Sequence, residues 1–464
     1  MRSNKYLFIL LLLLSLVLAT CTKTPPKPTT EVSQDTSPLT IWWTQGHYAE
    51  ETETIKQVVA QWEKKSGIEA ELTIYTEDDI LKQTQSALEA GNPPDILFDH
   101  RADSTVSPRW AWEGKLADVS DVIEPVKELY TSSAIASVYL YNNIAKKRAY
   151  YAVPLKQHSL HIHYWRDILA EIGLSEKDIP KTWDAFWEFW QQAQDTLRQQ
   201  GQKNIYGIGL TMSAEGTNDT FFQFEQALEA YDVQLLDDKG RLLLDDPKVR
   251  QGLITTLNWY TNFYKEGYVP PGAVDWVGAD NNVNFLNRVT LMTLNTTLSI
   301  PASQRKEEEI YRNQMGTIPF PDEPDGENPK YLVAVKHLLI FASSKHQEAA
   351  KDFLSYLVQP ENLSSHVKGS VGRWFPVMPS LWEDSFWKDK ADSHVWVAGQ
   401  QFSEGSTRPL YQVLNPAYTQ VKLENIWGQA IERVVVDDLS PEKAIDEAIE
   451  RIKEIFAEWN SGNF

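Results

Sequence analysis

Three side chains near the start of this sequence could together bind a hydroxylated ring. Trp43, Gln45 and His47 stand at alternate positions just after a short apolar run. An indole offers a flat apolar face, and amide and imidazole groups exchange hydrogen bonds with hydroxyls. Because side chains alternate across a strand, we expect Trp43 to face the ligand and Trp42 to enter the core, unless the register is shifted by one residue. The pattern favours a carbohydrate or polyol ligand.

A second polar segment could supply charged groups to the same ligand. Asp99, His100 and Arg101 directly follow the apolar run 96–98. Loops at strand ends commonly carry function, and charged groups bind hydroxyls through short charge-assisted hydrogen bonds. We expect Asp99 or Arg101 to contact the ligand, with a solvated loop as the alternative.

Further candidate ligand contacts lie far apart in the sequence. Each is polar or aromatic and stands near the end of a predicted strand or in a turn, where a side chain can face a cleft. The chain has 17 tryptophans, and Trp276 and Trp374 are the ones expected to add apolar faces for stacking. The remaining candidates are Lys156, Gln157, Glu215, Asn295 and Arg373.

Three closely spaced histidines raise the question of a metal site. His158, His161 and His163 are of a type that binds zinc, but no thiol or carboxylate at ligand spacing accompanies them. Hydrogen bonding within the fold is therefore the preferred interpretation. We expect no metal and no other cofactor.

The elements that must position these side chains alternate between strand and helix. The runs 39–43, 68–75 and 95–98 have the composition of strands, and 50–65 and 79–90 have the apolar periodicity of helices. This order predicts a parallel, doubly wound sheet, in which ligands bind beyond the carboxyl ends of the strands. Both polar loops lie at such ends.

One aromatic stripe is predicted to belong to the core. Trp183, Phe186, Trp187 and Trp190 recur at helical spacing after Thr182, a residue suited to cap a helix. Apolar residues at this spacing form the buried face of a helix. We therefore do not count them as a sugar platform.

The N-terminal segment has the features of a secretion signal. Arg2 and Lys5 precede an apolar run that is too short to span a bilayer, and Cys21 follows as the single cysteine. This arrangement resembles the lipobox of bacterial lipoproteins, which implies a signal peptide over 1–20 and lipidation of Cys21. Residues 21–38 are rich in proline and threonine and predict a flexible tether. We expect a membrane-anchored extracytoplasmic lipoprotein, in the periplasm or at the cell surface, with plain secretion as the alternative.

The charge balance restricts the partners. Removal of residues 1–20 takes away two basic residues and leaves 42 basic against 64 acidic residues, a formal charge of −22. Such a charge disfavours nucleic acids and anionic lipid headgroups, so we expect no nucleic-acid partner. It permits a neutral ligand or a cationic one, which keeps a polyamine or peptide open as an alternative to a small neutral carbohydrate or polyol.

No motif of catalysis is found in the sequence. It contains no G-x-S-x-G, no phosphate-binding loop and no H-E-x-x-H. A secreted glycosidase would also need aromatic residues and two carboxyl groups about 5–10 Å apart, but no spacing singles out such a pair. We expect a binding protein, with a glycosidase as the alternative from another class.

Several stretches, in order, resemble the extracellular solute-binding proteins of ABC transporters, family 1, the sugar-binding type that includes maltose-binding protein. The similarity runs from about residue 39 to residue 460. It rests on an ordered set of motifs rather than on any one of them. The stretches are 39–43, 94–98, 153–154, 164–167, 180–184, 291–292, 316–321 and 344–354.

The resemblance implies an α/β fold of two lobes, the periplasmic-binding-protein fold. Each lobe would be a doubly wound sheet flanked by helices, and a hinge would join them at crossings near 153–161 and 329–338. Asp99 stands where an aromatic residue is found in this type, so stacking would come from elsewhere. The implied lobes are 39–155 with about 328–375, and about 156–327 with about 376–464.

The same resemblance implies a receptor that closes on its ligand. Hinge closure of this kind is a shift in population driven by ligand contacts to both lobes. The closed form of such a receptor, here expected to be a monomer, delivers its ligand to the permease subunits of an ABC importer.

Overall fold

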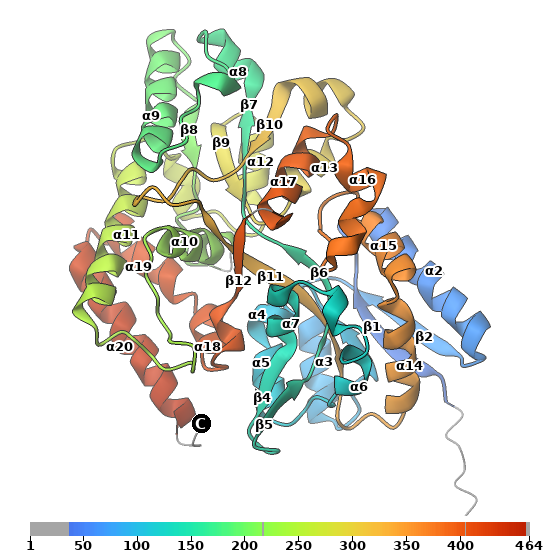
Figure 1. Cartoon of the computed structure of the whole chain (residues 1–464). Helices are drawn as coiled ribbons and strands as arrows, with labels where there is room; N and C mark the ends of the chain where they lie inside the picture. The colour runs from blue at the N-terminus through green and yellow to red at the C-terminus, as the bar shows by residue number, and fades with distance from the viewer. Residues whose placement is uncertain (1–36, 216–217, 404, 461–464) are drawn as a thin grey trace, which may run out of the picture. The chain divides into compact units, whose positions relative to one another are not determined.

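The computed structural model describes residues 37–215, 218–403 and 405–460 (Figure 1). The predicted signal peptide, Cys21 and nearly all of the predicted tether lie outside these residues. Among the described residues, no helix is both long and apolar enough to cross a membrane.

The first sheet contains the β-α-β-α-β unit that the sequence predicts. β1 (Leu39–Thr44) pairs in parallel with β2 (Ala70–Tyr75) and with β3 (Ile96–Phe98). The connecting helices are α2 (Ala49–Ser66) and α3 (Ile80–Glu89). The loops that follow β1, β2 and β3 therefore emerge at one edge of the sheet.

Helix α2 forms and docks for reasons that are visible in its sequence. Ile55, Val58, Val59 and Trp62 lie on its buried face, and Gly67 ends it in the left-handed conformation at φ 74°. The Trp62 indole N–H also donates to Asp352 at 2.8 Å, which ties α2 to α14 (Gln347–Leu357).

The second sheet has the strand order β10-β7-β9-β8. Its strands are β7 (His161–Trp165), β8 (Tyr206–Gly209), β9 (Thr290–Asn295) and β10 (Met315–Ile318). β10 can pair at this position because Gly316 has no side chain, since an added Cβ would lie 2.2 Å from the Tyr164 ring. β9 carries the chain directly to Asn295.

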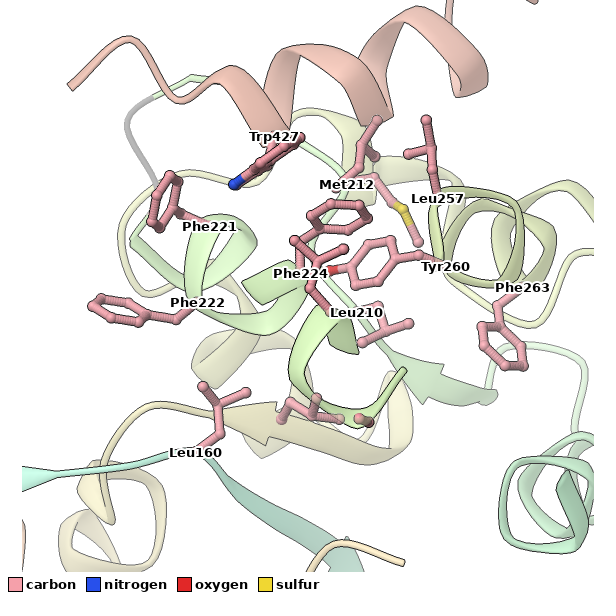
Figure 2. Close-up of a cluster of buried hydrophobic side chains, with 14 of the residues drawn as sticks. Leu160, Leu210, Met212, Phe221, Phe222, Phe224, Leu257, Tyr260, Phe263 and Trp427 are labelled. Carbon is pink, nitrogen blue, oxygen red and sulfur yellow. The ribbon is translucent and has the colours of Figure 1, made fainter. Parts of the chain in front are cut away.

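Each sheet belongs to its own hydrophobic core. Trp43, Phe98 and Phe353 lie in the first core. The second core is rich in aromatic residues, and Figure 2 shows Phe224 between Tyr260 and Trp427. The predicted core stripe is confirmed, because the second core includes Trp183, Phe186, Trp187 and Trp190.

Three segments connect the two cores. β6 (Val153–His158) leads into β7, and β11 (Lys330–Ile340) pairs antiparallel with both β6 and β3. The sequence predicts these two crossings. The third, β12 (Ser406–Pro409), pairs in parallel with the start of β11 and was not predicted.

The position of β12 bears on the predicted lobe boundary near residue 375. Val377, Trp387 and Ala398 lie in the first core, whereas Leu410 and the residues of the C-terminal helix lie in the second. We therefore propose that the first lobe extends to β12, because the chain returns to the second core only there. The other boundaries remain as predicted from the sequence.

The remaining regular elements surround the two sheets. A short hairpin is formed by β4 (Tyr139–Asn142) and β5 (Lys147–Tyr150). The helices are α4 (Ala102–Thr105), α5 (Ser107–Trp112), α6 (Ser120–Ile123), α7 (Ser132–Val138), α8 (Arg166–Glu171), α9 (Trp183–Gln199), α10 (Asn218–Ala230), α11 (Pro247–Lys265), α12 (Asp280–Leu286), α13 (Ser299–Ser303), α15 (Pro360–Lys368), α16 (Ser385–Lys388), α17 (Ser393–Ser403), α18 (Tyr418–Leu423), α19 (Ile426–Val435) and α20 (Pro441–Asn460).

Candidate functional site

A cavity of about 370 Å³ lies where loops of both sheets meet the crossing strands. A direct hydrogen bond from the Tyr48 hydroxyl to the Ser299 carbonyl (2.9 Å) joins the two sides, and so does one from His158 to the Thr296 carbonyl. A volume in this range suits a small organic ligand. The lining residues are His47, Glu77, Asp78, His100, Arg101, Ser104, His158, Asn218, Asp219, Phe222, Gly278, Ala279, Asn282, Asn295, Thr296, Thr297, Ser299, Lys336, Arg373 and Trp374.

The structure brings part of the predicted site together at this cavity. These residues come from the loops after β1, β3 and β9 and from the turn before Phe375, which are distant in sequence. The predicted residues that line it are His47, His100, Arg101, Asn295, Arg373 and Trp374.

Trp43 does not line the cavity, which corrects its predicted role. It is 2% exposed and stacks on Phe98 with ring centroids 4.3 Å apart, while Trp42 is only half-buried. The face of β1 that carries Leu39 and Ile41 is the buried one, and Trp43 continues that face. The two tryptophans are thus exchanged, which is the alternative of a one-residue shift in register that the sequence left open.

Asp99 is also buried away from the cavity. Its carboxylate accepts a hydrogen bond from the Thr44 hydroxyl (3.1 Å) and another from the Arg101 backbone N–H (3.2 Å). Burial raises the pKa of Asp99 to about 6, against the opposing effect of Arg101. Asp99 therefore supports the loop that carries Arg101 instead of reaching a ligand there.

The other predicted residues are placed outside the lining for different reasons. Gln157 is buried and donates to the Pro376 carbonyl at 2.6 Å, and Trp276 belongs to the second core. Gln45 and Glu215 are exposed to solvent and do not line the cavity. Lys156 is 2% exposed and lies behind the wall.

A buried carboxylate holds that wall together. Glu51, at the start of α2, is 3% exposed and lies 3.5 Å from the Lys156 ammonium and 3.5 Å from the Arg373 guanidinium. It also accepts the indole N–H of Trp374 at 3.2 Å. We call these four residues the Glu51 cluster. It joins α2, the crossing strand β6 and the turn that ends at Trp374.

The charges of the Glu51 cluster are unequal in number. Burial by itself would raise the pKa of Glu51. The positive charges of Lys156 and Arg373 lower this pKa by more than burial raises it, so it falls to about 2. Burial lowers the pKa of Lys156 to about 8, although the Glu51 carboxylate opposes this change. The positive charge of Arg373 also lowers the pKa of Lys156. One carboxylate therefore compensates two cations only in part.

The turn before the Glu51 cluster projects Arg373 and Trp374 into the site. Val371 and Gly372 both have positive φ, 56° and 87°, and a β-branched residue rarely adopts that conformation. Phe375 then exchanges two backbone hydrogen bonds of 2.9 Å with Gln157 on β6. Strained residues of this kind gather at functional sites, where the surrounding structure holds them in place.

The Trp374 ring is enclosed by imidazole and cationic groups. His100 stacks on it at 5.2 Å, and the Arg373 guanidinium lies 4.7 Å from the ring centroid. The ammonium groups of Lys156 and Lys336 lie 5.0 and 5.6 Å away. Only 3% of Trp374 is exposed, so it offers a ligand an edge and not a full face.

The opposite wall, from the second sheet, is mainly neutral and polar. Asn295 donates to the Ser299 hydroxyl at 2.9 Å, and Asn282 donates to the same hydroxyl at 3.2 Å. The Asn282 side-chain oxygen is buried and accepts no hydrogen bond from any described residue. Asp219 is the acid on this wall, and the Thr296 hydroxyl donates to it at 3.1 Å. Burial raises the pKa of Asp219 to about 6.

The three histidines considered as metal ligands form local hydrogen bonds. His158 donates to the Thr296 carbonyl at 2.6 Å, His163 bonds the Thr317 hydroxyl at 2.9 Å, and His161 bonds Gln401. Within the described part of the chain, no group of three or more His, Cys, Asp or Glu side chains is arranged to hold a metal ion.

Several lining residues were missed by the sequence interpretation. Asn295 was predicted because it ends a strand, and the same rule extended along that loop would have included Thr296 and Thr297. Lys336 lies inside β11, and Asp219 and Phe222 lie on α10, where no local signal distinguishes a lining residue from a core residue.

Comparison with known proteins gives consistent matches. A family model described as bacterial extracellular solute-binding protein matches residues 57–394. The chain is 22% identical to the galactooligosaccharide-binding protein of Bacillus subtilis, over 96% of each chain. It is 24% identical to a maltooligosaccharide ABC transporter solute-binding lipoprotein of Streptococcus pneumoniae, over 75% of each. An ABC transporter solute-binding protein of Thermotoga lettingae, solved with α-D-tagatose, superimposes with a TM-score of 0.72 at 24% identity, covering 90% of this chain and 99% of the other.

The Glu51 cluster predicts a specific loss of stability. Glu51→Gln leaves the buried Lys156 ammonium and the partly buried Arg373 guanidinium without this counter-charge, so we expect the free energy of unfolding at pH 7 to fall by about 3–5 kcal/mol. Glu53→Gln is the matched control, because Glu53 is 59% exposed and its ion pair with Lys56 is long, at 4.0 Å. It should cost less than about 0.5 kcal/mol. Urea-induced unfolding measures both.

The same pair of variants has a pH signature. The pKa of Glu51 is lower in the folded protein than in the unfolded chain, so its stabilising effect is complete at neutral pH and is lost as the pH falls from about 4.5 to about 2. Glu51→Gln should flatten this part of the profile. Equal urea midpoints for the two variants at pH 7 would contradict the assignment.

Proposed function

We propose a function for this chain from the premise that it belongs to the bacterial extracellular solute-binding protein family. Its fold is the two-lobed α/β fold of the periplasmic binding proteins, as the sequence resemblance implied. The chain acts, we propose, as an extracytoplasmic receptor that captures a carbohydrate or polyol and delivers it to the permease of an ABC importer.

The observation that carries this proposal is the composition of the cavity. One wall presents amide and hydroxyl groups of Asn282, Asn295, Thr297 and Ser299, which can both donate to and accept from ligand hydroxyls. The unpartnered Asn282 oxygen is an acceptor that a ligand hydroxyl would satisfy. The names of the relatives, which specify galactooligosaccharide and maltooligosaccharide, support the same class of ligand.

Binding between two lobes supplies the mechanism of capture. The ligand would contact both the loops of the first sheet and those of the second, and so favour the conformation in which both are near it. β6, β11 and β12 connect the two cores and would accommodate the relative motion at the hinge. Closure would then present the permease with a surface that forms only in the liganded state.

We propose that the protein performs no reaction on its ligand. The relatives named above are binding proteins. The cavity does contain carboxylates, but Glu77 and Asp78 are adjacent on one loop, and Asp219 is on the other wall, where the Thr296 hydroxyl donates to it. A hydrolysis assay on each saccharide that binds separates this proposal from a glycosidase.

A ligand screen tests the proposed function. Titration calorimetry with neutral and acidic mono- and oligosaccharides, and with spermidine and a tripeptide as non-saccharide ligands, should detect binding to a saccharide. Asn282→Ala removes the unpartnered acceptor, so we expect the saccharide to bind about 1–1.5 kcal/mol more weakly. Asn313→Ala is the control, because Asn313 is exposed and bonds Glu309. Binding of spermidine or the peptide alone would contradict the proposal.

The lipid anchor is a second part of the proposal. Cys21 would be acylated and would hold the monomeric receptor near its permease, which raises the local concentration of the loaded form. We expect Cys21→Ala to release the protein from the membrane fraction, whereas Thr22→Ala leaves it there. An N-terminal peptide that begins elsewhere, or carries no acyl chain by mass spectrometry, would show plain secretion.

A further inference from the structure

The two walls of the cavity differ in charge. The wall from the second sheet is made mostly of amides and hydroxyls, with Asp219 as its acid. The wall from the first sheet and the crossing strands carries Arg101, Lys336 and Arg373. The acids on that side, Glu77 and Asp78, have exposed fractions of 43% and 90%. Water therefore screens the charge of Asp78 strongly, whereas the Glu77 carboxylate lies 3.9 Å from the His100 imidazole and 3.9 Å from the Arg101 Nε.

Arg373 has hydrogen-bonding capacity that the protein does not use. Its guanidinium is 12% exposed, and it contacts the Glu51 carboxylate at the long distance of 3.5 Å. Glu51 is shared with Lys156 and with the Trp374 indole. The Nε–H of Arg373 is buried and has no partner within the described part of the protein. A buried donor without a partner is costly, so an acceptor is expected from a ligand or from water.

Arg101 shows the same feature. Its Nη2 donates a hydrogen bond to the Glu77 backbone carbonyl. Its Nε–H, however, is buried without a partner among the described residues, and the carboxylates of Glu77 and Asp78 lie 3.9 Å away, beyond hydrogen-bonding distance. Arg101 and Arg373 both line this cavity. Two guanidinium groups with free Nε–H donors suit a planar or tetrahedral oxyanion.

Lys336 does not compete for this role. Its ammonium is bonded to both oxygens of Asp103, at 3.0 and 3.1 Å, and both residues are buried. That pair is neutral as a unit. The cations on this wall without a close carboxylate partner of their own are therefore Arg373, which shares Glu51 with Lys156, and Arg101, whose nearest carboxylates lie 3.9 Å away.

We infer that the ligand is an acidic saccharide. Its hydroxyls face the wall from the second sheet, which carries Asn282 and Ser299, and its carboxylate or phosphate group faces Arg373 and Arg101. This inference rests on the proposed function and replaces the expectation of a neutral ligand. The formal charge of −22 does not exclude it, because the potential inside a cleft is set by the groups that line it.

The test compares matched ligands. Glucose, galactose and mannose, and a β-linked disaccharide of each, are titrated as the neutral sugar, as the uronate and as the 6-phosphate. We expect the tightest ligand to be acidic and to bind at least about tenfold more tightly than its neutral parent at low salt, with the difference shrinking as salt is added. The uronate and phosphate series distinguish the two sources of the oxyanion.

Variants identify the groups responsible. Arg373→Gln and Arg101→Gln should each remove most of the preference for the acidic ligand, and Arg373→Lys should keep part of it. Arg241→Gln, which removes a guanidinium that is 74% exposed and paired with Asp237, should keep all of it. Arg101→Gln leaves the Glu51 cluster intact, so it reports on the ligand even where Arg373→Gln lowers the melting temperature.

The outcomes are distinct. A neutral saccharide that binds as tightly as its acidic forms would overturn this inference and leave the proposed function standing. Failure of every saccharide, neutral and acidic, would overturn the proposed function itself. An acidic preference that survives both Arg101→Gln and Arg373→Gln would overturn the assignment of these two residues.

Discussion

The Glu51 cluster is the constraint on which the rest of the site depends. A buried carboxylate stays ionised when cations lie beside it. For Glu51 these cations are Lys156 on β6 and Arg373 in the turn before Phe375. Three segments that are far apart in the sequence are thereby fixed to one another, and Trp374 is held by the same carboxylate. None of these groups can move far without leaving a buried charge uncompensated. The part of the cavity wall that contains Arg373 and Trp374 is therefore held in place by Glu51.

The same constraint connects the fold to the choice of ligand. Because Glu51 is shared by two cations, it compensates Arg373 only in part, and the Arg373 Nε–H has no acceptor among the described residues. The wall from the second sheet has the opposite character, since its amides and hydroxyls are suited to an uncharged polyol. A ligand that contacts both walls must form hydrogen bonds with both. An acidic saccharide would do so with its hydroxyls on the wall from the second sheet and its oxyanion on the wall that carries Arg373.

Much of the fold could be predicted because its signals are local. The periodicity of apolar residues over 39–98 predicts the alternation of strands and helices. The helical spacing of the aromatic residues from Trp183 to Trp190 predicts that they are buried. β12 escaped prediction because Ser406–Pro409 is short, polar and half-buried, and its pairing with β11 depends on contacts distant in sequence. Trp43 was assigned to the wrong face because a strand flanked by loops does not itself fix which side is covered. Lys156 and Glu51 could not be paired at all, since nothing in either segment indicates the other.

The occupation of the cavity between the Glu51 cluster and the loop after β9 by a saccharide, which we propose, is tested most directly by a crystal structure of the protein with its tightest-binding saccharide. We expect ligand density between Arg373 and Ser299, with a hydroxyl bonded to the Asn282 oxygen and an oxyanion within hydrogen-bonding distance of the Arg373 Nε–H. A saccharide bound elsewhere on the protein, with this cavity filled only by water, would contradict it.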